Sequence, residues 1–405
     1  MPGARSVSLA AYVLAGSRLE TAQEAGAAHF MEHITFKGTA AYPTTRDVSE
    51  AVEGVGGSFN AATDRESTVY WVRVPLREAA RGVDILGELI IRPHLRGEEI
   101  ESERAVIVEE IRSYKDDPAE HVHSLFDLAM FGDTALGREI AGSEESVRAL
   151  PQENLRAFWA EAYRPGNVVV AAAGDISHED VVALVAKAFG SGKAERPVFD
   201  QAPALPAGDR IMVARRETSQ VQLCLGVPGL PRDDPLAWTL EVLNAILGDG
   251  MSSRLFQSVR EEKGLAYDVS SYIVDYADAG SLVVNAGVDP DSTAPAIGAI
   301  LDELARVRDE PVPADELARS KLYLGGRLEL RMEETRHVAS WLGGQEALHD
   351  RVLTLDQALE ELNGVTSESL QSLSRTLIND ANLRLAAITP RGKGRGLERL
   401  LRLPA

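Results

Sequence analysis

The chain has 405 residues, 44% of them hydrophobic and 26% charged, a composition that suits a globular protein of two domains and excludes a disordered or fibrous one. Its net charge of −20 repels phosphate backbones and anionic lipids, so we expect neither nucleic acid nor a membrane as a partner. The single cysteine, Cys224, cannot form an internal disulfide and favours a reducing compartment, for which we expect the cytoplasm.

The first half of the chain predicts a series of strands and helices that Gly and Pro separate. Residues 7–14 alternate as a strand does and begin almost at the N-terminus, so we expect that a preceding edge strand is missing from this sequence. Further strands are expected at 58–74, as two segments with a bend between them, and at 167–173. Helices are expected at 27–38, 45–55, 76–91, 98–113, 119–131, 151–163 and 177–189.

After a stretch rich in Gly, Pro and Ala, a similar order of elements begins again. Strands are expected at 220–227, 267–274, 280–286 and 383–388, and helices at 235–247, 253–262, 292–307, 314–332 and 367–377. The repetition indicates a diverged duplication. We therefore expect one domain at 1–190, a linker at 191–209 and a homologous second domain at 210–405.

Residues 29–33 read H-F-M-E-H and lie in the first predicted helix. Because His29 and His33 are four residues apart, a helix brings both imidazoles to one face, within reach of a single metal ion. Glu32 shares that face and can approach a metal-held water as a general base. The alternative is a surface helix with incidental histidines, but the apolar residues around the motif indicate a buried helix, where two unpaired histidines are costly. The corresponding helix of the second half has no such pair.

Zinc in hydrolases usually has three protein ligands and a water, so a third ligand has to come from another element. The long helix expected at 98–113 carries Glu103 and Glu110, which are seven residues apart and project to the same side, whereas Glu109 points elsewhere. One of the pair can bind zinc while the other supports a ligand from behind. Helical phase alone does not decide which of the two is the ligand.

Two other charged patterns do not indicate a site. His121 and His123 are two residues apart and point to different faces of a helix, so we interpret them as surface residues. Asp116 and Asp117 precede a proline and are interpreted as a helix start rather than as a catalytic pair of carboxylates.

The motif resembles that of the inverted zincin peptidases of the pitrilysin type, the group that contains insulin-degrading enzyme and mitochondrial processing peptidase. The likeness runs over nearly the whole chain, and A-H-F-M-E-H at 28–33 with F-K-G-T at 36–39 is similar to the processing-peptidase version. It implies an α+β fold of two homologous domains, each a mostly antiparallel sheet with helices packed on one face. It also implies one zinc ion per chain, with Glu110 as the third ligand and Glu103 supporting the ligands.

Two further segments resemble the substrate-binding parts of this family. The segment that contains Phe59, Asn60 and Ala61 is similar to the edge strand to which a peptide adds, although an ordinary hairpin covered by the second domain is the alternative. The sequence R-E-E-K-G-L-A-Y at 260–267 is similar to the family's Arg and Tyr pair. The resemblance implies that Arg260 holds substrate carbonyls and that Tyr267 stabilises the oxyanion; without it, we would interpret them as a helix-terminal arginine and a strand aromatic.

The resemblance thus implies a zinc-dependent endopeptidase that hydrolyses extended or unfolded peptides by a metal-activated water, with Glu32 as general base. It also implies a homodimer that encloses the peptide, because chains of this length in the family have two domains. The alternative is a non-catalytic subunit, like the core proteins of respiratory complexes, or a partner-dependent subunit of a heterodimeric processing peptidase. The sequence does not decide between a presequence-processing enzyme and a general oligopeptidase.

Overall fold

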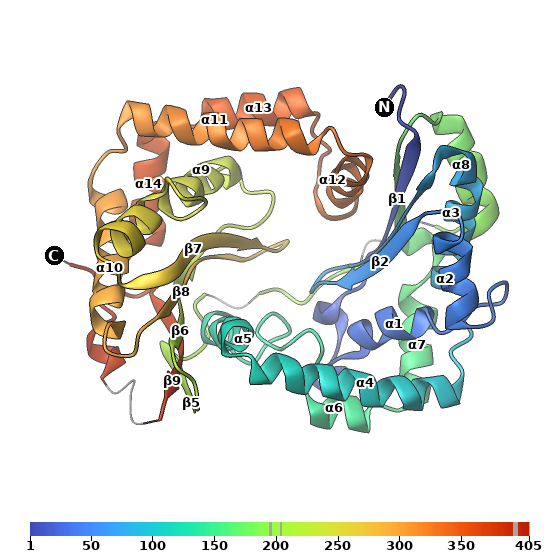
Figure 1. Ribbon diagram of the computed structural model, residues 1–405, viewed down its shortest axis with the longest axis horizontal. Coiled ribbons are helices and arrows are strands. Elements are labelled where there is room, and N and C mark those ends of the chain that lie inside the picture. Colours follow the sequence, from blue (N-terminus) through green and yellow to red (C-terminus); the bar gives the residue numbers. More distant parts are fainter. Residues whose placement is uncertain (194–196, 203–204, 392–395, 405) are drawn as a thin grey trace. The chain divides into compact units, whose positions relative to one another are not determined.

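The computed structural model describes residues 1–193, 197–202, 205–391 and 396–404, which form two compact units (Figure 1). Unit 1 comprises Met1–Ser113, Glu139–Asp200 and Glu329–Val352, and unit 2 comprises Tyr114–Arg138, Gln201–Leu328 and Leu353–Ala405. The two units therefore alternate along the chain. The linker expected at 191–209 includes residues 194–196 and 203–204, which lie outside the described part.

Unit 1 is built on a four-stranded antiparallel sheet in the order β2-β3-β1-β4. The strands are β1 (Ser6–Val13), β2 (Ser58–Thr63), β3 (Thr68–Pro75) and β4 (Val168–Ala173). The helices are α1 (Ala27–Thr35), α2 (Thr45–Glu53), α3 (Ala79–Ile91), α4 (Gly97–Asp116), α6 (Glu144–Ala149), α7 (Gln152–Ala162), α8 (His178–Phe189) and α12 (Thr335–Leu348), and α4 ends in unit 2. Short 3-10 turns lie at Ser17–Leu19, Ala22–Glu24, Leu76–Glu78 and Pro165–Asn167.

Unit 2 is built on a five-stranded sheet in the order β5-β9-β6-β8-β7, in which only β5 and β9 pair in parallel. The strands are β5 (Ile211–Arg216), β6 (Val221–Pro228), β7 (Ala266–Asp275), β8 (Gly280–Val288) and β9 (Arg384–Pro390). The helices are α5 (Pro118–Phe131), α9 (Ala237–Leu247), the π-helix Phe256–Glu262, α10 (Thr293–Asp309), α11 (Ala314–Arg331), α13 (Leu355–Gly364), α14 (Ser367–Leu377) and the 3-10 turn Leu397–Arg399. The expected fold class, α+β with two mostly antiparallel sheets, is confirmed.

Four strands occur in the same order in both sheets, because β2-β3-β1-β4 of unit 1 corresponds to β7-β8-β6-β9 of unit 2. This is the arrangement that a duplication produces. The sheets differ beyond the last of these strands, where β5 covers the outer edge of β9. No strand within the described ranges pairs with the outer edge of β4, and a cavity of about 690 Å³ between β4, α8 and α12 lies there.

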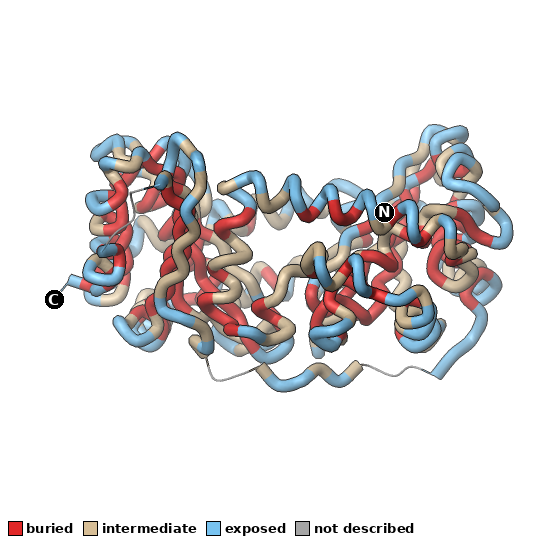
Figure 2. The backbone as a smooth tube through the Cα atoms, turned by 90° about the horizontal axis from the view of Figure 1, so that it is seen from below, coloured by how far each residue is buried: buried red, intermediate tan, exposed pale blue. Residues whose placement is uncertain are grey.

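The inner strands β1, β6 and β8 are buried on both faces, and the buried residues are concentrated in the interior of each unit (Figure 2). In β1, Leu9 and Ala11 face a core shared with α1 and α3, whereas Ala10 and Tyr12 face α12. In unit 2, α5 packs on β6 and β9 in the same way. Each sheet thus has a helix on its second face, which the expectation of helices on one face did not include.

These two covering helices come from opposite halves of the chain. Helix α5 precedes the expected linker but belongs to unit 2, and α12 follows the linker but belongs to unit 1. The sequence patterns predicted the helix α5 but not that it packs on the second sheet. They did not predict α12, because its two consecutive glycines weaken a helical pattern. Helix α12 is also bound to β1 by a hydrogen bond, which Tyr12 Oη donates to the carbonyl of Ser340, 2.9 Å away.

The packing of α5 also changes the interpretation of two histidines. His121 is only 9% exposed, and Nδ1 of His123 lies 2.6 Å from Oη of Tyr272 in β7, so their interpretation as surface residues is wrong. The helix start is confirmed, because the side chain of Asp117 accepts a hydrogen bond from the N–H of Ala119. Within the described part of the chain, no helix is long and apolar enough to cross a membrane.

A glycine substitution tests the packing of α12 on the sheet. A Cβ at Gly343 would lie 2.8 Å from Cε2 of Tyr12 and 2.9 Å from Cβ of Ala171, so Gly343→Ala should lower the free energy of unfolding by about 1–3 kcal/mol. Gly326→Ala in α11 is the matched control, because nothing lies within 4 Å of its Cβ and alanine favours a helix by about 1 kcal/mol. Denaturant unfolding should show opposite signs for the two variants, and a Gly343→Ala variant as stable as the parent would contradict this packing.

Candidate metal centre and active site

Helix α1, which carries the H-F-M-E-H motif, begins at a buried carboxylate. Glu20 is 5% exposed, and its two oxygens accept hydrogen bonds from the N–H groups of Gly26 (2.9 Å) and Ala28 (2.7 Å). The first N–H groups of a helix have no partner within the helix, and each would cost about 1–3 kcal/mol if buried without an acceptor. Gly26 has φ +99°, which favours glycine. Glu20 thereby fixes where α1 starts and how its histidines are placed.

The side chains of His29, His33 and Glu110 converge between α1 and α4. Nε2 of His33 lies 3.4 Å from Oε2 of Glu110, and Nε2 of His29 lies 3.8 Å from Oε1 of the same carboxylate. One ligand atom of each residue lies within 4.8 Å of the others, and the two imidazole centroids are 4.6 Å apart. Within the described residues, this is the one cluster of three or more such side chains that could hold a metal ion.

This donor set fits zinc. Tetrahedral zinc with bonds of about 2.0–2.1 Å keeps its ligand atoms about 3.4 Å apart, close to the two distances from Glu110. Two imidazoles and one carboxylate also leave a fourth position open, as in zinc hydrolases. Glu110 is half exposed in side-chain terms, so the cluster opens to solvent on the carboxylate side. The three side chains could therefore hold a zinc ion that remains accessible to a substrate.

Glu103 supports His33 from behind. Its Oε1 lies 3.0 Å from Nδ1 of His33, and its Oε2 forms an ion pair with Nζ of Lys37. The carboxylate is 5% exposed in side-chain terms, so both of its oxygens are held in a buried place. The hydrogen bond favours the proton on Nδ1 and leaves the lone pair of Nε2 directed to the cluster.

Burial and charge act differently on the two histidines. Burial lowers the pKa of His29 to about 4, and the neighbouring imidazole of His33 adds to this effect. His29 is therefore neutral near pH 7, the state that binds metal. For His33, burial opposes protonation, but the hydrogen bond to Glu103 and the charge of Glu110 outweigh it and raise the pKa. In Glu103, too, the partners favour the charged form. Burial raises the pKa of its carboxyl, but the contacts with His33 and Lys37 outweigh burial and lower that pKa.

Glu32 points to the same region from α1 and is held by the sheet. Oγ1 of Thr63, the last residue of β2, donates a hydrogen bond of 2.6 Å to Oε2 of Glu32. Burial raises the pKa of Glu32, and the hydrogen bond from Thr63 opposes that shift. A carboxylate with a raised pKa beside two imidazoles is the arrangement that suits a general base.

The segment expected to bind substrate forms β2, an edge strand that, among the described strands, pairs with β3 alone. The side chains of Phe59 and Ala61 face inward, with Phe59 against the ring of Phe36 at 5.6 Å between centroids. Asn60 is exposed, and its Oδ1 accepts a hydrogen bond from the N–H of Ala61. Any pairing of a peptide with this strand therefore uses its backbone, while Phe59 and Ala61 support it from the core side.

Arg260 and Tyr267 belong to unit 2, where the structure brings them together. The guanidinium of Arg260 lies 4.9 Å from the ring centroid of Tyr267 and 4.7 Å from that of Phe256. Both sit in unusual backbone: Arg260 is in a π-helix, and Tyr267 is the extra residue where the register of β7 and β8 shifts. Such features often aim side chains at functional sites. Tyr267 is 78% exposed, and its expected approach to the metal cluster stays a prediction.

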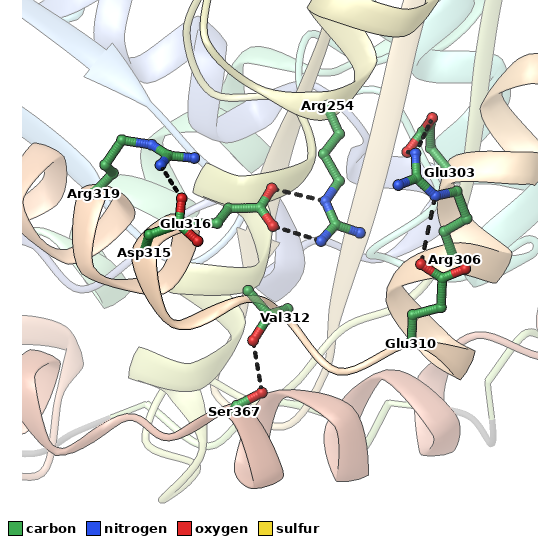
Figure 3. A network of polar contacts seen from close by, with 9 residues as sticks. All are labelled: Arg254, Glu303, Arg306, Glu310, Val312, Asp315, Glu316, Arg319 and Ser367. Atoms are coloured by element: carbon green, nitrogen blue, oxygen red, sulfur yellow. Dashed lines mark hydrogen bonds and ion pairs between the residues drawn. The ribbon is translucent and has the colours of Figure 1, made fainter.

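The π-helix is anchored at its start by a charged network (Figure 3). Arg254 donates two hydrogen bonds to the carboxylate of Glu316 in α11, of 2.8 and 2.6 Å. A two-point arginine–carboxylate contact restricts orientation as well as distance. Arg254 is 11% exposed in side-chain terms, so the pair is largely shielded from water. It fixes the backbone two residues before the π-helix that carries Arg260.

Sequence reasoning missed three residues that shape this site. Glu20 caps α1 from a loop, Lys37 neutralises Glu103, and Thr63 binds Glu32. Of these three contacts, the sequence could indicate only that the side chain of Thr63 faces inward, because residues of β2 alternate between the two faces of the sheet. Which helix residue it would meet depends on how α1 packs on the sheet.

The comparisons with known proteins agree with this fold. A family model described as "Insulinase (Peptidase family M16)" matches residues 1–144, and one described as "Peptidase M16 inactive domain" matches residues 149–324. The chain therefore belongs to peptidase family M16, the pitrilysin family, which confirms the resemblance found in its sequence.

Relatives of the chain are named as zinc proteases, and two of them match most of its length. An uncharacterized zinc protease of Streptomyces coelicolor is 37% identical over 385 residues, covering 93% of this chain and 84% of the relative. The uncharacterized zinc protease YmxG of Bacillus subtilis is 36% identical over 398 residues, covering 96% of this chain and 95% of the relative. A solved protease from Helicobacter pylori has the same fold, with a TM-score of 0.90 at 20% identity, over 96% of this chain and 95% of that one.

The contact between Glu103 and His33 predicts a loss of metal affinity on substitution. Glu103→Gln keeps the shape of the side chain but removes the charge that orients His33 and pairs with Lys37, so zinc affinity should fall about 10- to 100-fold. Competition with a chromogenic chelator measures this. Glu109→Gln is the matched control on the same helix, because Glu109 is exposed and pairs with Arg112. Equal affinities of the two variants would contradict a supporting role of Glu103.

Proposed function

We propose that this protein is a zinc-dependent endopeptidase that hydrolyses peptide bonds of extended or unfolded peptides. The observation that carries the proposal is the convergence of His29, His33 and the carboxylate of Glu110, with Glu32 beside them on α1. Membership of family M16 and relatives named as zinc proteases support it. A zinc ion held by the three residues would polarise the substrate carbonyl and lower the pKa of an attacking water.

In this proposal Glu32 moves the proton. Its carboxylate takes a proton from the attacking water and later donates it to the leaving amine, so that the amine departs neutral. The raised pKa that burial gives Glu32 brings its acidity closer to neutral pH, which favours both directions of this transfer. Glu103 and Lys37 keep the imidazole of His33 in one orientation throughout.

The substrate is proposed to bind as an added strand along β2. Backbone hydrogen bonds to an edge strand do not depend on side chains, so an extended peptide of varied sequence fits and a folded protein does not. Arg260 is proposed to hold substrate carbonyls, and Tyr267 to donate a hydrogen bond to the developing oxyanion. The exposure of Tyr267 and its contact with Arg260 support this assignment.

A homodimer in the cytoplasm is proposed as the working form. One chain carries both the metal cluster and the Arg260 and Tyr267 pair, so a second, different subunit is not required. A monomer in sedimentation at working concentrations would contradict this. The alternative is a non-catalytic or partner-dependent subunit, for which the match of 149–324 to an inactive domain is the supporting observation. The intact cluster in unit 1 favours the enzyme.

Metal removal and loss of the base test the proposal together. A quenched fluorogenic peptide should be cleaved by the parent, lose cleavage with a chelator and regain it with added zinc. Glu32→Gln should bind zinc as the parent does, because Glu32 is outside the cluster, but turnover should fall by about 10²- to 10⁴-fold. Zinc quantification accompanies each assay. Cleavage by Glu32→Gln at the parent's rate would rule out this mechanism.

Tyr267→Phe tests the pair on unit 2. Removal of a hydroxyl that stabilises the oxyanion should lower kcat about 10²- to 10³-fold, with zinc content unchanged. Tyr42→Phe is the control, because its hydroxyl is bound to Asp84 on the surface of unit 1. If Tyr267→Phe turns over peptide as fast as Tyr42→Phe, then Tyr267 is an ordinary strand aromatic.

A further inference from the structure

The contact of Thr63 with Glu32 joins the edge strand to the base. Thr63 ends β2, and its side chain shares the inward face of the strand with Phe59 and Ala61. The hydrogen bond from Oγ1 of Thr63 to Oε2 of Glu32 is 2.6 Å long, the length of a hydroxyl bound to a charged oxygen. A hydroxyl donor at the end of β2 therefore faces the carboxylate of Glu32.

Thr63 is itself firmly placed. It pairs in register with Thr68 of β3, whose hydroxyl lies 3.5 Å from its own. Thr68 in turn donates a hydrogen bond of 2.9 Å to the carbonyl of Ala15 and is fully buried. A threonine side chain is branched at Cβ and has few rotamers, so its hydroxyl keeps one direction. By contrast, the terminal torsion of a glutamate is broad, and its carboxylate turns freely without a partner.

We propose that Thr63 is a positioning residue for the reaction: its hydroxyl holds one oxygen of Glu32, so that the other is directed to the attacking water. Because Thr63 belongs to β2, the base is held by the strand to which the peptide adds. The position of the base and the position of the substrate therefore share one rigid element. This inference rests on the proposed function, in which Glu32 is the general base.

Three possible roles of Thr63 differ in whether its loss affects folding, substrate affinity or turnover. If Thr63 only stabilises the hairpin, its hydroxyl matters for folding and not for the rate of the bound substrate. If it binds substrate, its loss weakens affinity. If it positions Glu32, its loss slows turnover while affinity, zinc content and folding are kept.

The first experiment compares Thr63→Val, which has the same shape without the hydroxyl, with Thr63→Ser, which keeps the hydroxyl. With a fluorogenic peptide and one zinc per chain in each protein, Thr63→Val should lower kcat about 10- to 100-fold with KM within about threefold. Thr63→Ser should stay within about threefold of the parent. Equal rates of Thr63→Val and the parent, or an equal loss in both variants, would overturn the proposal.

The second experiment separates positioning from binding and from packing. Equilibrium binding of the same, uncleaved peptide to Glu32→Gln and to Glu32→Gln with Thr63→Val should give dissociation constants within about threefold, and a larger loss would make Thr63 a binding residue instead. Ser374→Ala in α14 removes a buried hydroxyl that bonds to the carbonyl of Leu370, away from Glu32, and should lower the melting temperature but leave kcat within about threefold. A loss of kcat in Ser374→Ala as large as in Thr63→Val would overturn the proposal.

The two levels of the hypothesis fail in different ways. A parent protein without chelator-sensitive cleavage would overturn the proposed function and this inference with it. A parent that is active, with Glu32→Gln inactive and Thr63→Val at full rate, would overturn only the role of Thr63.

Discussion

The burial of both faces of β1 is the constraint on which the rest of unit 1 depends. Alternate residues of this strand face opposite sides, and both sides carry buried apolar residues, Leu9 and Ala11 on one and Ala10 and Tyr12 on the other. One side packs on α1 and α3, and the other requires α12, which arrives from the second half of the chain. Unit 2 solves the same problem with α5 from the first half. In each unit, a helix from the other half of the chain thus covers the second face of the sheet.

The candidate site inherits its rigidity from this packing. Helix α1 lies between the sheet and α4, its N-terminus is fixed by Glu20, and its Glu32 is bound by Thr63 of the sheet. Helix α4 supplies Glu103 and Glu110 from the other side. The contacts of Glu103 with His33 and of Thr63 with Glu32 restrict the orientation of His33 and Glu32 as well as their distance, whereas Nδ1 of His29 is buried without a partner among the described residues.

Some residues of the site could be predicted from the sequence and others could not. The spacing of His29 and His33 was enough to predict their common face, because a helix repeats every 3.6 residues whatever it packs on. Helical phase left open whether Glu103 or Glu110 is the metal ligand, since both project to one side of the helix. In the structure, Glu103 contacts Nδ1 of His33, whereas Glu110 lies near the Nε2 atoms of both histidines. The bulge at Tyr267 and the π-helix at Arg260 were not predicted, because both arise from register and packing.

The sequence by itself determined the local periodicities, the common face of His29 and His33, the family and the α+β class, because these depend on residues close together in the chain or on resemblance to known motifs. Only the tertiary structure decided which helix covers each sheet, which oxygen Thr63 binds and which cation pairs with Glu103. The physical reason is the same in each case: these contacts join residues dozens to hundreds of positions apart. Their formation depends on how apolar surfaces pack, and a linear pattern does not encode that directly.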